Sequence, residues 1–231
     1  MAIGEPDGTD QAGTSQAGTD QAGAVADRIA DEIFRPGGPV RRNLADVLHQ
    51  LGAIDRAVYV AVAEVPAPAL DRAMRRLSTS ANHSALWLGI AAALAATGPH
   101  GRRAATRGVL AIGVTSAAVN IGVKSLARRR RPDRAGAGVP GQRHVTMPTS
   151  TSFPSGHSAS AFAFATAISR DNPWLAIGIQ FVAGAVAYSR VHTGVHYPGD
   201  TIVGALIGAG AGQAVSSVLD RAIARRDDRD R

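Results

Sequence analysis

Apolar residues dominate the second half of the chain in five long intervals that contain no charged side chain. These intervals are residues 77–101, 108–123, 144–169, 172–189 and 201–219. Each contains an apolar stretch close to the length that crosses a bilayer as a helix, which needs roughly 17–25 residues. Charge is confined almost entirely to the ends of the intervals, which favours membrane spans over the alternative, buried helices of a soluble α-helical protein. The pattern predicts an all-α integral-membrane helical bundle with five spanning helices, or six if residues 45–75 also cross the bilayer.

Small residues give the predicted spans a means of packing closely. We place the spans at about 84–99, 106–124, 156–170, 173–190 and 199–219. Within the last span a glycine recurs at every fourth position, at Gly204, Gly208 and Gly212. That spacing allows helices to approach one another closely in lipid. Trp87 and Trp174 are expected near the membrane interfaces.

The N-terminal part of the chain is polar and repetitive. Residues 8–23 repeat the pentapeptide Gly-Thr-Asp/Ser-Gln-Ala, which has little to bury, so this stretch is predicted to be disordered. It also lacks the basic start and apolar stretch of a signal peptide. Residues 24–34 show the spacing of a short helix.

Two amphipathic segments follow between Asn43 and Leu77, interrupted by Pro66 and Pro68. Both carry charged residues, including Asp55 and Asp71, and are therefore predicted to lie on the membrane surface. The expected organisation is a disordered tail with a short helix, amphipathic interfacial helices, a membrane domain and a charged tail. Their limits are 1–40, 41–80, 81–222 and 223–231.

Composition narrows the chemistry. The mean hydropathy is zero only because a polar N-terminus is averaged with a far more apolar second half. The absence of cysteine excludes a disulfide framework, a thiolate nucleophile and a cysteine-based zinc site. The net charge of +7 suits an anionic partner, which can be nucleic acid, anionic lipid or a phosphorylated substrate. Lys124 is the one lysine among 25 basic residues.

Polar residues converge if consecutive spans run in opposite directions. The second span then ends on the membrane face where the third begins, the fourth ends and the fifth begins. The polar residues at these four ends are Lys124, Arg131, Ser155, His157, Arg190, His196 and Asp200. The opposite face carries arginines but no histidine except His100.

These residue types suit phosphate chemistry. Arginine donates two parallel N–H groups to phosphate oxygens. A histidine such as His196 can act as a nucleophile or base, and Asp200, four residues later, can orient its ring. Ser155 and Gly156 open a predicted helix whose free N–H groups form an anion site.

The three motifs resemble those of the type 2 phosphatidic acid phosphatase superfamily. Lys-x6-Arg-Pro matches Lys124 to Pro132, Pro-Ser-Gly-His matches residues 154–157, and Ser-Arg-x5-His-x3-Asp matches Ser189 to Asp200. The resemblance covers about residues 70–220. Family members often carry six spans, and here the first is missing or reduced to the amphipathic segments before Leu77.

The resemblance implies a role for each motif residue. His196 is expected to attack phosphorus and form a phosphohistidine, with Asp200 orienting its ring. His157 is expected to act as general acid and then as general base. The expected phosphate-binding residues are Lys124, Arg131, Ser155, Gly156 and Arg190.

No metal or other cofactor is expected. The only carboxylates between Arg134 and Leu219 are Asp171 and Asp200, and the predicted topology places Asp171 on the opposite face. Two-metal phosphatase sites need several carboxylates. The three cationic side chains of the motifs are expected to supply the positive charge instead.

The leading hypothesis is a membrane phosphatase that hydrolyses a phosphomonoester or diphosphate of a lipid. The alternatives are a soluble-type acid phosphatase or vanadate-dependent haloperoxidase sharing the motifs, and a non-catalytic membrane module that binds anionic lipid. The lipid itself stays open among polyprenyl phosphate or diphosphate, phosphatidic acid and phosphatidylglycerol phosphate. The oligomeric state stays open as well.

Nucleic acid is not an expected partner, because the run Arg128–Arg130 adjoins a span and is predicted to meet lipid head groups. The resemblance implies a bacterial cell membrane with the active site on the extracytoplasmic face. His192 and His144 receive no role.

Overall fold

The computed structural model describes residues 39–124 and 127–229. The predicted disordered repeat at 8–23 and the helix at 24–34 lie outside these residues. Contacts divide the chain into two units, residues 1–54 and 55–231. The contacts reported below lie within the second unit. The domain limits expected at residues 40, 80 and 222 stay predictions.

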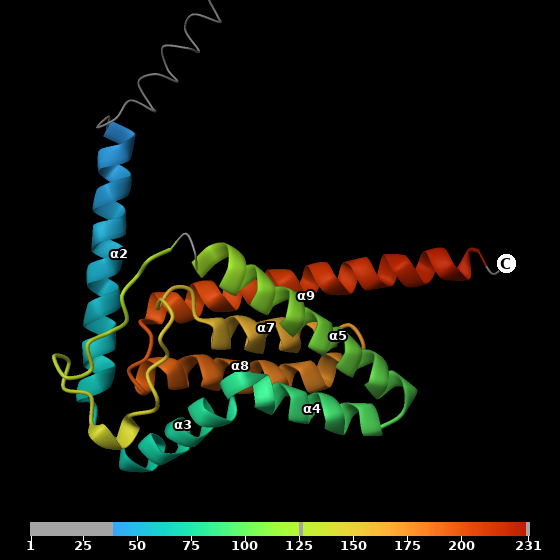
Figure 1. Cartoon of the computed structure of the whole chain (residues 1–231), viewed down its shortest axis with the longest axis horizontal. Helices are drawn as coiled ribbons and strands as arrows, with labels where there is room; N and C mark the ends of the chain where they lie inside the picture. Colours follow the sequence, from blue (N-terminus) through green and yellow to red (C-terminus); the bar gives the residue numbers. More distant parts are fainter. Residues whose placement is uncertain (1–38, 125–126, 230–231) are drawn as a thin grey trace, which may run out of the picture. The chain divides into compact units, whose positions relative to one another are not determined.

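Helices make up the regular structure of the described residues, which contain no strand (Figure 1). The α-helices are α2 (Pro39–Glu64), α3 (Pro68–Ser80), α4 (Ala85–Ala96), α5 (Pro99–Ala117), α7 (Gly156–Ile168), α8 (Pro173–His192) and α9 (Pro198–Asp227). Short segments are the 3₁₀ turns η1 (Asn82–Ser84) and η3 (Gly141–Arg143) and the π-helix η2 (Ala118–Val123), which continues α5. The predicted all-α architecture is confirmed.

Proline and capping residues set where the helices begin. α3, α5, α8 and α9 each begin at a proline, whose fixed φ suits the first helical position and whose missing N–H is not needed there. The Ser155 hydroxyl accepts a hydrogen bond from the Ser158 N–H at 3.4 Å and so caps α7. Asn172 caps α8 through the Leu175 N–H at 3.1 Å.

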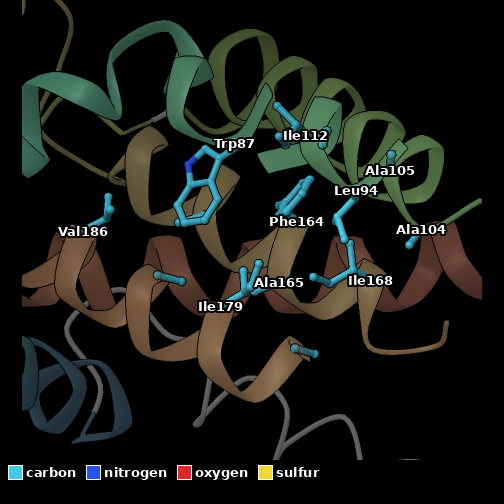
Figure 2. Close-up of a cluster of buried hydrophobic side chains, with 14 of the residues drawn as sticks. Trp87, Leu94, Ala104, Ala105, Ile112, Phe164, Ala165, Ile168, Ile179 and Val186 are labelled. Carbon is cyan, nitrogen blue, oxygen red and sulfur yellow. The ribbon is translucent and has the colours of Figure 1, made fainter. Parts of the chain in front are cut away.

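Helix α7 is the centre of the bundle and packs against α5, α8 and α9 (Figure 1). The prediction for Trp87 is wrong: it is 1% exposed and its ring lies 5.7 Å from that of Phe164 (Figure 2). Alanine-rich helices leave room between them, and this large side chain fills it. Trp174, by contrast, is 84% exposed.

The glycines of α9 let it lie directly on α7. A Cβ added at Gly208 would collide with the carbonyl oxygen of Ala159, and one at Gly204 would collide with that of Ser155. A Cβ at Gly212 would come within 2.5 Å of the Ala163 carbonyl oxygen. The close packing predicted from the four-residue glycine spacing is confirmed.

Three helices of the described residues are long and apolar enough to cross a membrane: Pro99–Val123, Pro173–His192 and Pro198–Arg226. Large apolar side chains on them face outward, among them Phe181 (76% exposed) and Leu206 (68%). α4 and α7 have 12 and 13 residues. At 1.5 Å per residue they measure about 18–20 Å, less than the hydrocarbon core of about 30 Å. The intervals therefore do form helices, whereas the count of five spans stays a prediction.

Candidate active site

The predicted site residues gather where α7 and α9 begin and α8 ends. Lys124 follows directly on η2, and π-helical turns of this kind are frequent at functional sites. His157 lies in the first turn of α7, Arg190 in the last turn of α8 and Asp200 in the first turn of α9. The loop after Ala127 contributes Arg131. Antiparallel neighbours thus bring together residues that are far apart in the sequence.

His196 is held between a guanidinium and a carboxylate. Its Nε2 lies 3.3 Å from an Arg131 nitrogen, and its Nδ1 lies 3.5 Å from Asp200 Oδ2. Burial lowers the pKa of His196 to about 4; the Asp200 carboxylate opposes this shift, whereas the charges of Arg131 and Arg190 add to it. The imidazole is therefore neutral at pH 7, and its Nε2 has a lone pair available for attack.

Asp200 is fully buried, and its carboxylate accepts several hydrogen bonds. The Tyr197 N–H donates to its Oδ2 at 3.0 Å, and Arg129 donates to its Oδ1 at 2.8 Å. The Ser152 hydroxyl donates to Oδ2 and lies 3.4 Å from His196 Nδ1. A carboxylate fixed by several donors holds the His196 ring in one orientation.

The three predicted cations are held by neutral groups. Arg131 donates to the carbonyl oxygens of Ser150 and Val195, both at 2.8 Å. Arg190 donates to Ser78, at 3.2 Å to its carbonyl and 2.6 Å to its hydroxyl. Lys124 lies 3.3 Å from the Ser150 hydroxyl. Among the described residues no carboxylate forms an ion pair with any of the three, so their charge is left for an anion.

His157 lies close enough to Arg190, Lys124 and Arg131 for their positive charges to act on it. Its Nε2 is 3.0 Å from the Asn82 side-chain oxygen. Lys124, Gly156 and His157 line one cavity of about 200 Å³.

Ser155 differs from the other predicted phosphate-binding residues because its polar groups are buried and hydrogen-bonded within the protein. Its side chain is fully buried, its hydroxyl caps α7, and its N–H donates to the Asp200 carbonyl at 2.9 Å. Gly156, its neighbour, instead opens onto the cavity, and a Cβ there would lie 3.7 Å from Lys124 Nζ.

Arg129 and Asp55 were missed by the sequence reasoning. The expectation that Arg129 meets lipid head groups is wrong, because it bridges Asp200 and Asp55, the latter at 2.6 Å. Asp55 also accepts the Gly199 N–H at 2.7 Å. The loop is extended here, and Arg129 and Arg131 are half-buried whereas Arg128 and Arg130 are exposed. The run of four arginines shows no contrast in the sequence itself. Its one signal was that Arg129 lies two positions before the motif residue Arg131, which puts both on one side of an extended segment.

Asp71 and His192 belong to a separate buried cluster. Asp71 accepts from Arg143 at 2.7 Å and lies 2.8 Å from His192 Nε2. Arg143 also donates to the Val62 carbonyl at 2.9 Å. The reading of Asp71 as a surface charge is therefore wrong, since it ties α3 to α8 and to the loop. His144 is exposed, and its Nε2 lies 3.1 Å from the Val139 carbonyl oxygen.

A family model described as the PAP2 superfamily matches residues 104–224. The chain is 37% identical over 164 residues to a protein of Mycobacterium tuberculosis named decaprenylphosphoryl-5-phosphoribose phosphatase. That match covers 70% of this chain and 89% of the relative.

Two solved structures are similar to the fold. The first transmembrane PAP2 type phosphatidylglycerolphosphate phosphatase from Bacillus subtilis matches with a TM-score of 0.61 and 25% identity, over 77% of this chain and 91% of that chain. LpxE from Aquifex aeolicus matches with a TM-score of 0.56 and 25% identity, over 69% and 92%.

Proposed function

The chain belongs to the PAP2 superfamily and is a membrane phosphatase of lipid phosphates, and we propose that it works through a phosphohistidine formed on His196. The observation that carries this proposal is the setting of the His196 ring. One nitrogen faces Asp200 and Ser152, while the other faces Arg131 and is unprotonated at neutral pH.

In the first step His196 Nε2 attacks phosphorus, and the bond from phosphorus to the leaving oxygen breaks on the opposite side. His157 donates a proton to that oxygen, so an alcohol departs and the phosphoryl group stays on nitrogen. Asp200 orients the ring and stabilises the positive charge that it acquires.

In the second step water enters the position that the alcohol has left. His157, now a base, takes a proton from it, and the resulting oxygen attacks phosphorus. Phosphate departs and His196 is regenerated. Lys124, Arg131 and Arg190 bind the equatorial oxygens throughout, and the Gly156 N–H contributes to the same site.

The reaction is proposed to need no metal ion. Three cations without a carboxylate partner among the described residues provide the charge that a metal would otherwise supply. Retention of full turnover in excess EDTA, after exhaustive dialysis, would support this part of the proposal. Restoration of a lost rate by Mg²⁺ or Mn²⁺ would contradict it.

The substrate is proposed to be a phosphomonoester of a lipid. Candidates include polyprenyl phosphate, phosphatidic acid, phosphatidylglycerol phosphate and the decaprenylphosphoryl-5-phosphoribose of the relative's name. Phosphate release from each, with pure protein in detergent, ranks them.

Rapid-quench labelling in alkaline detergent tests the intermediate directly. Protein mixed with a ³²P-labelled lipid phosphate and quenched within milliseconds should carry label that survives alkali and is lost in acid, as expected for a phosphoramidate. His196→Ala should carry none and lose essentially all turnover. His157→Ala should be labelled slowly and should also release the label slowly, because His157 acts in both steps. Full activity of His196→Ala would refute the mechanism.

We also propose that the site faces the extracytoplasmic side of a bacterial cell membrane, as the family resemblance implies. The chain contains no cysteine, so a single Gly141→Cys variant offers one label site, in an exposed turn of the loop. Labelling by a membrane-impermeant maleimide in intact cells is the expected result. Labelling only after lysis would show that the site faces the cytoplasm instead.

A further inference from the structure

The cavity beside His157 is lined by polar side chains that the proposed reaction does not use. Three elements surround it: the η1 turn, the end of α5 with η2, and the first turns of α7. Its lining residues outside the motifs include Ser84, Ser116, Asn120 and Ser160, and their hydroxyl and amide groups are of the kind that bind sugars or polyols.

A polar stripe runs along one candidate span into this cavity. Ser116, Asn120 and Lys124 recur every fourth residue and all line it. Their neighbours in the span are apolar or small, and uncharged polar groups at such positions are retained for packing or function. The Ser116 hydroxyl lies 3.4 Å from that of Ser160 on α7, so the two helices present paired hydroxyls.

The η1 turn contributes an unusual backbone. His83 and Ser84 have φ of 52° and 60°, a left-handed conformation that non-glycine residues rarely adopt. Such conformations persist where the surrounding structure enforces them and are frequent at ligand sites. Both residues line the cavity, and Asn82 between them and α3 holds His157.

The position of the cavity identifies what enters it. His157 and Lys124 line it, whereas His196 does not. An in-line displacement puts the leaving oxygen on the side of phosphorus away from His196, next to the group that protonates it. The cavity is therefore on the leaving-group side.

We propose that this cavity is a subsite for a polyhydroxylated leaving alcohol, a sugar or glycerol headgroup carrying the phosphate, rather than for an apolar prenyl alcohol. This inference rests on the proposed phosphohistidine mechanism. Asn120, Ser116 and Ser160 hydrogen-bond the hydroxyls of the alcohol as His157 protonates its departing oxygen. A prenyl alcohol in the same place leaves these polar groups unpaired, which a site built for hydroxyls discriminates against strongly.

The test compares kcat/KM for three lipid phosphates: a polyprenyl-linked phosphoribose, phosphatidylglycerol phosphate and polyprenyl monophosphate. Wild-type protein should prefer one of the hydroxylated substrates over polyprenyl monophosphate. Asn120→Leu should lower kcat/KM for that substrate about tenfold, the value of one hydrogen-bonding pair, and leave polyprenyl monophosphate within about twofold. Ser116→Ala combined with Ser160→Ala should act in the same direction.

Gln180→Leu is the matched control. It makes a polar-to-apolar change in another candidate span, outside this cavity, where Gln180 contacts Thr166 at 3.4 Å. It should leave the ratio between substrates unchanged. Which hydroxylated substrate loses more in Asn120→Leu decides between a sugar and a glycerol headgroup.

Two outcomes overturn the inference while leaving the proposed function intact. If Asn120→Leu slows all three substrates equally, the cavity serves only the hydrolytic water. If wild-type protein prefers polyprenyl monophosphate, the leaving group is apolar. Failure of the proposed function looks different, because wild-type protein would then form no acid-labile phosphoenzyme with any substrate.

Discussion

Two buried arginines of the spanning helices, Arg107 and Arg190, lie near opposite ends of the bundle and differ in their partners. Arg107 on α5 is 5% exposed and pairs with Asp171 at 2.9 Å and Asp220 at 2.5 Å. Arg190 on α8 is 1% exposed and has no carboxylate partner among the described residues, only the oxygens of Ser78. Chain topology places Arg190 beside His196 and places Arg107 at the far ends of α7 and α9.

The difference is the one expected between an arginine that stabilises the fold and one that, as proposed, binds the phosphoryl group. A buried charge is costly unless an opposite charge compensates it. At the Arg107 end the chain supplies that compensation with two carboxylates. At the Arg190 end no carboxylate among the described residues pairs with Lys124, Arg131 or Arg190, and in the proposed mechanism a phosphate dianion supplies the missing negative charge.

Arg107→Gln tests the structural end and has the largest expected effect. It leaves Asp171 and Asp220 without their cation, so the free energy of unfolding in detergent should fall by about 3 kcal/mol. Folded variant protein should keep its kcat, since Arg107 is remote from His196. Normal stability with a reduced kcat would break the comparison.

Arg190→Gln tests the other end. Removing one donor to the phosphoryl oxygens should lower kcat/KM by about 10²–10³-fold. Thermal stability should be unchanged or raised, because an uncompensated buried charge disappears. Destabilisation as large as that of Arg107→Gln would show that Arg190 is structural as well.

Arg129→Gln tests a third arginine, which lies near His196 and forms ion pairs with two carboxylates. Losing the bridge between Asp55 and Asp200 should loosen the orientation of His196 and reduce kcat about tenfold, with KM nearly unchanged. Arg128→Gln and Arg130→Gln are matched controls on exposed neighbours and should keep full kcat. Equal losses in all three variants would point to lipid binding instead.

The smallest expected effect concerns the pH dependence of activity and stability. His196 has a pKa of about 4 because it is buried beside two guanidinium groups. The acid limb of kcat/KM should therefore lie near pH 4, with a tenfold fall per unit below it, rather than near 6.5. Since the unfolded chain binds this proton near 6.5, stability should also decline between pH 6.5 and 4. An acid limb near 6.5 would show that His196 is not desolvated in solution.

Connectivity explains why the residues predicted to form the site lie together in the structure. Apolar intervals of alternating direction force Lys124, His157 and Arg190 to one end, whatever the details of packing. The motif spacing placed Asp200 one helical turn from His196, and the structure puts their side chains side by side. The spacing of the α9 glycines, one at every fourth residue, likewise predicted that this helix packs closely against another.

Contacts between distant segments were beyond that reasoning. Asp55 and Asp71 carry charge on amphipathic helices, and in the sequence they are indistinguishable from solvated residues. Only the folded chain shows Asp55 against Arg129 and Asp71 against Arg143. Trp87 was misplaced for the same reason, since a tryptophan near the end of an apolar stretch fits an interface or a core equally well.

The amino-acid sequence by itself determined the helical membrane class, the family and the end of the bundle where the chemistry-bearing residues meet. Those features follow from hydrophobic length, chain direction and short-range spacing, which are local properties. The tertiary structure decided which arginines are neutralised, which serine touches the His196 ring and which polar groups surround the cavity. These depend on separations of a few ångströms between segments up to 144 residues apart, as from Asp55 to Gly199, and no local pattern encodes such distances.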